Sequence, residues 1–218
     1  MTDWVTISQV ATAGGTLVLA IATFASIKSA NRSARVAERS MLAAQRPILI
    51  PSRDNDPRET VRFGDGHVIV VEGHGGRLEF ANDRLYMAMA VRNGGAGVAV
   101  IHGWRVSVRR QGLNANTAAP ALEDFRRQAR DLYIPPQQSG FWQGAIRDSD
   151  DADYADLVAV ARGGERLNVD LLYGDYEGGQ RTIARFGIAS GTDPNESEET
   201  RDKADVLRYW NVDGSDPR

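Results

Sequence analysis

The chain has 218 residues, a formal net charge of −3 and no cysteine, so disulfide frameworks and thiolate metal sites are excluded. The charge is uneven along the chain. Residues 1–46 carry five basic and two acidic side chains, and the acidic excess lies in the remainder. An acidic domain behind a basic segment argues against a nucleic-acid partner.

The first predicted element is an uncharged run, Trp4–Ile27, without Asp, Glu, Lys or Arg. At about 1.5 Å per residue, a helix of this length crosses the roughly 30 Å core of a bilayer. A buried helix of a soluble protein is the alternative, but such a helix rarely runs this long without a charge. A cleaved signal peptide needs a basic segment before the apolar run, and Met1–Asp3 supplies no basic side chain. We therefore expect a retained transmembrane helix over about 4–27.

The residues on either side of this run predict its orientation. No Lys or Arg precedes it, and five basic residues follow it closely. The positive-inside rule then places the C-terminal domain in the cytoplasm and the N-terminus outside. The same basic face suits anionic lipid head groups. The basic membrane-flanking residues are Lys28, Arg32, Arg35, Arg39 and Arg46.

The helix is expected to continue beyond the membrane, because residues 26–45 contain neither Gly nor Pro. Pro47 disfavours helix at Arg46 and supplies the stop. Small and apolar residues recur here with the a/d spacing of a heptad, on the face opposite the basic residues. This seam predicts pairing with a second copy or with a partner helix. Two alternatives stay open: the helix packs on its own domain, or it lies at the lipid surface. The seam residues are Ile27, Ala30, Ala34, Ala37, Met41 and Ala44.

From Pro47 onward, short alternating runs and Gly-rich turns replace the heptad pattern. These short strands, together with two small helices, predict an antiparallel immunoglobulin-like β-sandwich over 47–189. The fold class is therefore mainly β with an N-terminal helix. Strands are expected at 48–50, 60–63, 67–71, 77–80, 84–91, 98–109, 132–134, 141–146, 167–173 and 182–188, and helices at 121–130 and 150–162.

The two strongest strands differ in their patterns. Arg84–Val91 is apolar on both faces, so both faces are expected to be covered. In Val98–Arg109, strict alternation places one set of side chains on the core face and the arginines in solvent. That core set is Val98, Val100, His102, Trp104, Val106 and Val108.

Residues 190–218 form a polar, acidic tail whose composition is typical of disorder. Its segment 206–212 is too apolar for a free tail and is expected to dock on the sandwich or on a partner. The docking residues are Val206, Leu207, Tyr209 and Trp210.

No catalytic, cofactor-binding or metal-binding residue is predicted. His67, His74 and His102 lack the spacing of a zinc site. The acidic residues from Asp148 to Asp153 lack the Gly and Glu of a calcium loop, and acids at a helix N-terminus explain them. Gly73–Gly76 is followed by no Lys-Ser or Lys-Thr, so it reads as a turn and not as a phosphate-binding loop.

Two turn motifs carry a resemblance. Asn93–Ala99 is similar to an Asn-x-Gly-x-Gly-x-Ala segment, although its spacing slips by one at Gly95, and Tyr173–Gly178 is similar to Tyr-x-Asp-x-x-Gly. Both resemble segments of uncharacterised bacterial membrane-anchored proteins. The resemblance implies an N-terminal span in the bacterial inner membrane, a Pro, and then a β-rich domain, and it implies no activity.

Three functional hypotheses follow. The first is a non-enzymatic, single-pass interaction module whose helix anchors and pairs while the domain binds another protein in the cytoplasm. The second is a membrane-anchored enzyme or ligand-binding domain with a site that the sequence does not reveal. The third is an extracytoplasmic sandwich.

Overall fold

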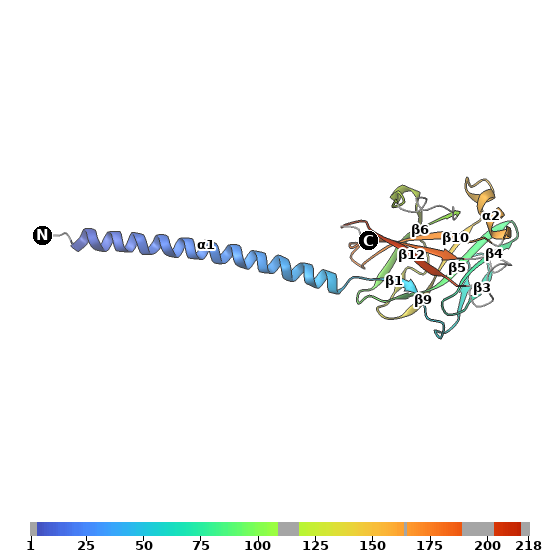
Figure 1. Ribbon diagram of the computed structural model, residues 1–218, viewed down its shortest axis with the longest axis horizontal. Helices are drawn as coiled ribbons and strands as arrows, with labels where there is room; N and C mark the ends of the chain where they lie inside the picture. The colour runs from blue at the N-terminus through green and yellow to red at the C-terminus, as the bar shows by residue number, and fades with distance from the viewer. Residues whose placement is uncertain (1–3, 109–117, 164, 189–202, 215–218) are drawn as a thin grey trace. The chain divides into compact units, whose positions relative to one another are not determined.

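The computed structural model describes residues 4–108, 118–163, 165–188 and 203–214. The chain forms two compact units, residues 1–44 and 45–218. As expected, a long N-terminal helix is followed by a mainly β domain of antiparallel sheets (Figure 1).

The first unit is one helix, α1, which runs from Trp4 to Ala44. Among the described residues, α1 is the one helix that is long and apolar enough to cross a membrane. Its apolar side chains are exposed in the single chain. Three threonines place polar hydroxyl groups in the apolar run of α1. The hydroxyls of Thr12, Thr16 and Thr23 each donate to the carbonyl four residues earlier at 2.8 Å, so none needs a partner from lipid.

One sheet of the domain is built on β5 (Arg84–Asn93). β9 (Ser139–Ile146) pairs along one side of β5, and the other side is shared by β4 (Gly76–Ala81) and β1 (Leu49–Pro51). All these pairings are antiparallel. β5 is therefore the central strand of this sheet.

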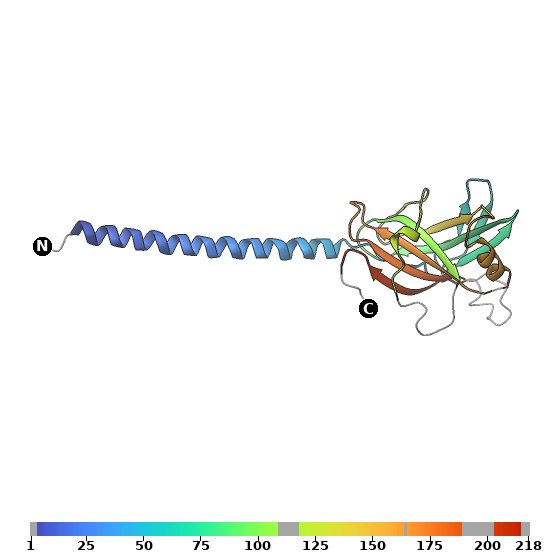
Figure 2. The same cartoon turned by 90° about the horizontal axis from the view of Figure 1, so that it is seen from above.

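The second sheet has the order β12–β11–β10–β6 and is also antiparallel. It consists of β6 (Ala99–Val108), β10 (Leu167–Gly174), β11 (Thr182–Ile188) and β12 (Asp205–Asn211). Two short strands, β7 (Arg126–Arg127) and β8 (Tyr133–Ile134), pair with the free side of β6. Figure 2 shows β12, in red, at the margin of this sheet.

A separate hairpin joins β2 (Glu59–Arg62) to β3 (Val68–Val71). Its turn contains Gly66 at φ 89°, a left-handed conformation that favours glycine. The hairpin covers the outer face of β5, where Tyr86, Ala88 and Ala90 pack with Val61 and Ile69. The other face of β5 faces the main core. The prediction that both faces of this strand are covered is confirmed.

The main core is one cluster to which both sheets contribute. Met87, Met89 and Trp142 come from the first sheet, and Val169 and Phe186 come from the second. Helix α2 (Tyr154–Gly163) adds its apolar side chains to this cluster.

The prediction of a helix at 121–130 is wrong. Only Leu122–Asp124 forms a 3₁₀ turn, and Phe125 is extended. The next two residues become β7, because Gly103 lets the backbone of β7 approach closely: an added Cβ there would lie 2.8 Å from the Arg126 carbonyl oxygen. Pairing with β6 therefore overrides the helical propensity of this segment.

The strict alternation expected in 98–109 is also wrong. Against β10, Leu172 pairs with Gly103 and Tyr173 pairs with Ile101, so His102 is an extra, bulged residue. The bulge reverses the alternation. Ile101 and Trp104 are both buried, whereas Val100 and His102 are only half-buried. Arg109 lies outside the described residues.

The C-terminal segment forms β12, which pairs with β11 of its own domain. Trp210 is buried, Tyr209 and Val206 pack against the main core, and Leu207 stays exposed. Residues 190–202 lie outside the described residues.

Candidate functional site

The segment that leads into the domain, Gln45–Leu49, is held by side chains from several strands. We call this set the linker clamp. It consists of Asn93, Tyr173, Thr182, Tyr209 and Asn211, with the glycines Gly95 and Gly97 beneath the linker.

Asn93 is the most deeply placed member and is fully buried at the end of β5. Its Oδ1 accepts hydrogen bonds from the amides of Ile48 at 3.2 Å and Gly95 at 2.9 Å. Its Nδ2 donates to the carbonyls of Gly97 at 2.7 Å and Ile134 at 3.0 Å. The buried amide group is therefore fully satisfied while it fixes both the linker and the turn.

The glycines after Asn93 allow the linker to lie directly on the turn. A Cβ added at Gly95 would come closer than 3.0 Å to the Arg46 carbonyl oxygen, and one added at Gly97 would do the same to Gln45. The resemblance motif Asn93–Ala99 therefore serves a close backbone approach as well as a turn. It also carries the chain from one sheet to the other.

Two tyrosines hold the backbone of Leu49 from both sides. The Leu49 amide donates to the Tyr173 hydroxyl at 3.3 Å, and the Tyr209 hydroxyl donates to the Leu49 carbonyl at 2.7 Å. Burial raises the pKa of Tyr173 to about 12, and burial also raises the pKa of Tyr209. Both hydroxyls therefore stay protonated at physiological pH.

Arg46 belongs to the domain rather than to the row of basic residues on α1. Its Nη2 donates to Thr182 Oγ1 at 3.0 Å and to Asn211 Oδ1. Lys28, Arg32, Arg35 and Arg39 lie exposed on α1, as do the six seam residues. A small pocket of 180 Å³ remains between Arg46, Ile48 and the two tyrosines.

The two resemblance motifs thus meet at the linker, which their sequences do not indicate. The first residue of each, Asn93 and Tyr173, contacts the linker directly. Asp175 of the second motif instead stabilises its own hairpin, where Oδ1 accepts from the amides of Glu177 and Gly179.

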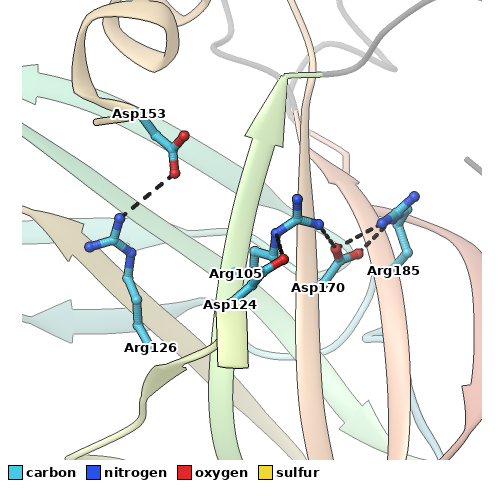
Figure 3. Close-up of polar contacts among 6 residues, drawn as sticks. All are labelled: Arg105, Asp124, Arg126, Asp153, Asp170 and Arg185. Carbon is cyan, nitrogen blue, oxygen red and sulfur yellow. Dashed lines mark hydrogen bonds and ion pairs between the residues drawn. The ribbon is translucent and has the colours of Figure 1, made fainter. Parts of the chain in front are cut away.

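A second polar cluster lies on the face of the second sheet opposite the core (Figure 3). The carboxylate of Asp170 is fully buried between two arginines of neighbouring strands. Arg185 contacts it at 2.6 and 2.8 Å, and Arg105 lies 3.5 Å away. A cleft of 760 Å³ borders this cluster. Because carboxylates already engage both arginines, we assign the cluster a structural role.

The three histidines do not converge. His67 stacks on Tyr86 at 4.0 Å and contacts Glu79, while His74 lies 3.6 Å from Asp54. His102 sits in the β6 bulge, where burial lowers its pKa. Among the described residues, no group of three His, Asp or Glu side chains is placed to hold a metal ion.

The other sequence candidates have local roles. Asp151 forms a two-point ion pair with Arg126 at 2.6 and 2.9 Å, and Asp148 caps the turn before α2 through the Asp150 amide. Gly73 packs under the carbonyl of Arg53, where a Cβ would not fit. This is a tightly packed turn.

Comparison with protein-family models, curated proteins and solved structures finds no match to this chain.

Proposed function

We propose that this protein is a single-pass, membrane-tethered interaction module of the bacterial inner membrane, without catalytic activity. α1 anchors the chain, and the domain beyond it, which we take to be an immunoglobulin-like sandwich, binds a protein partner. One combination of features carries the proposal. The apolar surface of α1 is uncovered in the single chain, and the linker clamp holds the segment that follows α1 in the sequence.

The sandwich is supported by the main core, which the two sheets share, and by the antiparallel pairing of all strands in the described part of the chain. Both sheets keep edge strands, as open sandwiches do. The clamp fixes the first residues of the domain on its own strands, so this part of the domain is ordered before a partner binds.

Helix pairing is the second part of the proposal. The seam from Ile27 to Ala44 is exposed along its whole length in the single chain. Small residues at a and d let two helices approach closely, and confinement in a bilayer compensates for the small area that alanine buries.

Orientation is the third part, and it rests on the four basic residues exposed on α1 after the apolar run. We propose that the domain lies in the cytoplasm and that these residues contact anionic head groups.

Topology is the decisive test. The chain has no cysteine, and a Cβ added at Gly214 meets no atom within 4 Å, so Gly214→Cys gives a clean reporter. We expect a membrane-impermeant maleimide to label this variant only after lysis, and the chain to stay in the membrane pellet after alkaline washing. Labelling in intact cells would move the domain to the other side, and loss from the pellet would contradict the anchor.

A further inference from the structure

A cleft at the margin of the two sheets gathers four arginines. We call it the arginine cleft, of 660 Å³. It lies between the β2–β3 turn, the start of β5, the end of β9 and the β7 segment. Such clustering is unexpected in a domain whose sequence is acidic overall. The arginines are Arg84, Arg127, Arg130 and Arg147.

One carboxylate organises half of the cleft. Asp65 Oδ2 accepts from Arg84 Nη1 at 3.1 Å, Arg147 Nε at 3.0 Å and the Tyr86 hydroxyl at 2.9 Å. Burial opposes ionisation of Asp65, but the bonds from Tyr86 and Arg147 outweigh it and lower its pKa. Two guanidinium groups therefore share a single negative charge, which leaves positive charge at the cleft.

The other half carries two arginines that have no acidic partner among the described residues. In the described part of the chain, no carboxylate lies within ion-pair distance of Arg127 or Arg130. The Arg130 guanidinium covers the turn: an added Cβ at Gly64 would lie 3.6 Å from its Cζ and from both terminal nitrogens. This arginine is thus placed over the cleft by the hairpin turn.

The floor of the cleft is fixed. Trp104 is only 7 % exposed, and Gln128, also buried, donates from Nε2 to the carbonyls of Arg130 and Gln143. Gln143 in turn donates to Asp131. Among the residues that line the cleft, four guanidinium groups stand against one carboxylate, that of Asp65.

We propose that the arginine cleft binds a soluble ligand with clustered oxyanions, phosphate groups foremost. Guanidinium groups match phosphate and carboxylate oxygens in planar, two-point geometry. This proposal goes beyond the protein-binding role proposed above, because it adds a second, small ligand to the same domain.

Within the domain, the arginine cleft and the linker clamp lie at opposite ends of β5. Arg84 begins β5 and Asn93, in the linker clamp, ends it. At about 3.3 Å per residue, the two ends of this strand are separated by roughly 30 Å.

The test is calorimetric titration of the full chain in nonionic detergent with sodium pyrophosphate at low salt. In the double variant Arg127→Gln/Arg130→Gln, we expect the Kd to rise about tenfold or more, which corresponds to ~1.4 kcal/mol. Both side chains are exposed, so the fold tolerates the change. Arg58→Gln removes one positive charge from an exposed site outside the cleft and should leave the Kd unchanged.

Three results would overturn the proposal: no binding of pyrophosphate, equal weakening in Arg58→Gln, or cleft-dependent binding of short-chain phosphatidylglycerol without binding of pyrophosphate. The last result would assign the cleft to lipid. None of them bears on the maleimide test, so failure of the ligand proposal and failure of the membrane-tethered module are distinguishable.

Discussion

Asn93, Tyr173 and Tyr209 show how single residues fix the linker. Each uses a polar group that is buried or half-buried and satisfied by the backbone of the segment it holds. In a buried setting, a lost partner costs the desolvation of the group left behind, about 1–3 kcal/mol. The clamp therefore depends on all three side chains at once.

The two tyrosines predict how stability changes at high pH. The unfolded phenol ionises near pH 10, whereas burial holds the Tyr173 pKa at about 12. Above pH 10 the unfolded state releases its proton first, so stability should fall as pH rises from 10 to 12, by up to about 1.4 kcal/mol per pH unit from Tyr173. Urea unfolding across this range measures the slope.

Tyr173→Phe should flatten that slope, although the variant is already less stable at pH 7. Tyr176→Phe is the matched control, because Tyr176 is 72 % exposed. An unchanged slope in Tyr173→Phe would contradict the clamp as described.

At the scale of elements, the sequence predicts where strands lie in the chain better than how they pair with other strands. The alternating runs gave β2, β3, β5, β10 and β11 nearly at their observed bounds. The bulge at His102 could not be predicted, because it arises from the register against β10, more than 60 residues later. The helix prediction at β7 was wrong for a related reason, because pairing with β6 at Gly103 overrides the helical spacing of this segment.

The candidate site was predictable only in part. The sequence marks Asn93–Gly97 and Tyr173 as turn and strand residues, and it marks 206–212 as a docking segment. It does not indicate that they meet at the linker, because that contact joins residues separated by 45 to 160 positions. The sequence does not predict the arginine cleft for the same reason, because its four arginines lie on three segments that are separate in the chain.

The seam on α1 gives a prediction at this scale. If two copies pair through it, Ala34→Cys at an a position should form a disulfide-linked dimer in membranes under mild oxidation. Ser29→Cys, at a c position of the same helix, is the control and should cross-link far less. Equal cross-linking at both positions would indicate random collision. If neither variant forms a cross-linked dimer, two copies of the helix do not pair through this seam.

At the scale of the whole molecule, the linker clamp joins the two ends of the domain sequence. Arg46 and Leu49 enter at its beginning, and Tyr209 and Asn211 come from its last strand. β12 therefore does more than complete a sheet, because it also closes on the segment that leads to the anchor. A loosened β12 should release the linker before it unfolds the core.

Hydrogen exchange of the full chain tests this coupling. In Tyr209→Phe/Asn211→Ala, the hydrogen bonds to the Leu49 carbonyl and to Arg46 are lost. We expect the amides of Ile48 and Leu49 to exchange faster, while amides in the β5–β9 ladder keep their protection. Tyr133→Phe, at a tyrosine 66 % exposed, should change neither set. Faster exchange throughout the domain would mean that β12 supports the whole core, and unchanged linker amides would mean that Asn93 and Tyr173 hold the linker without it.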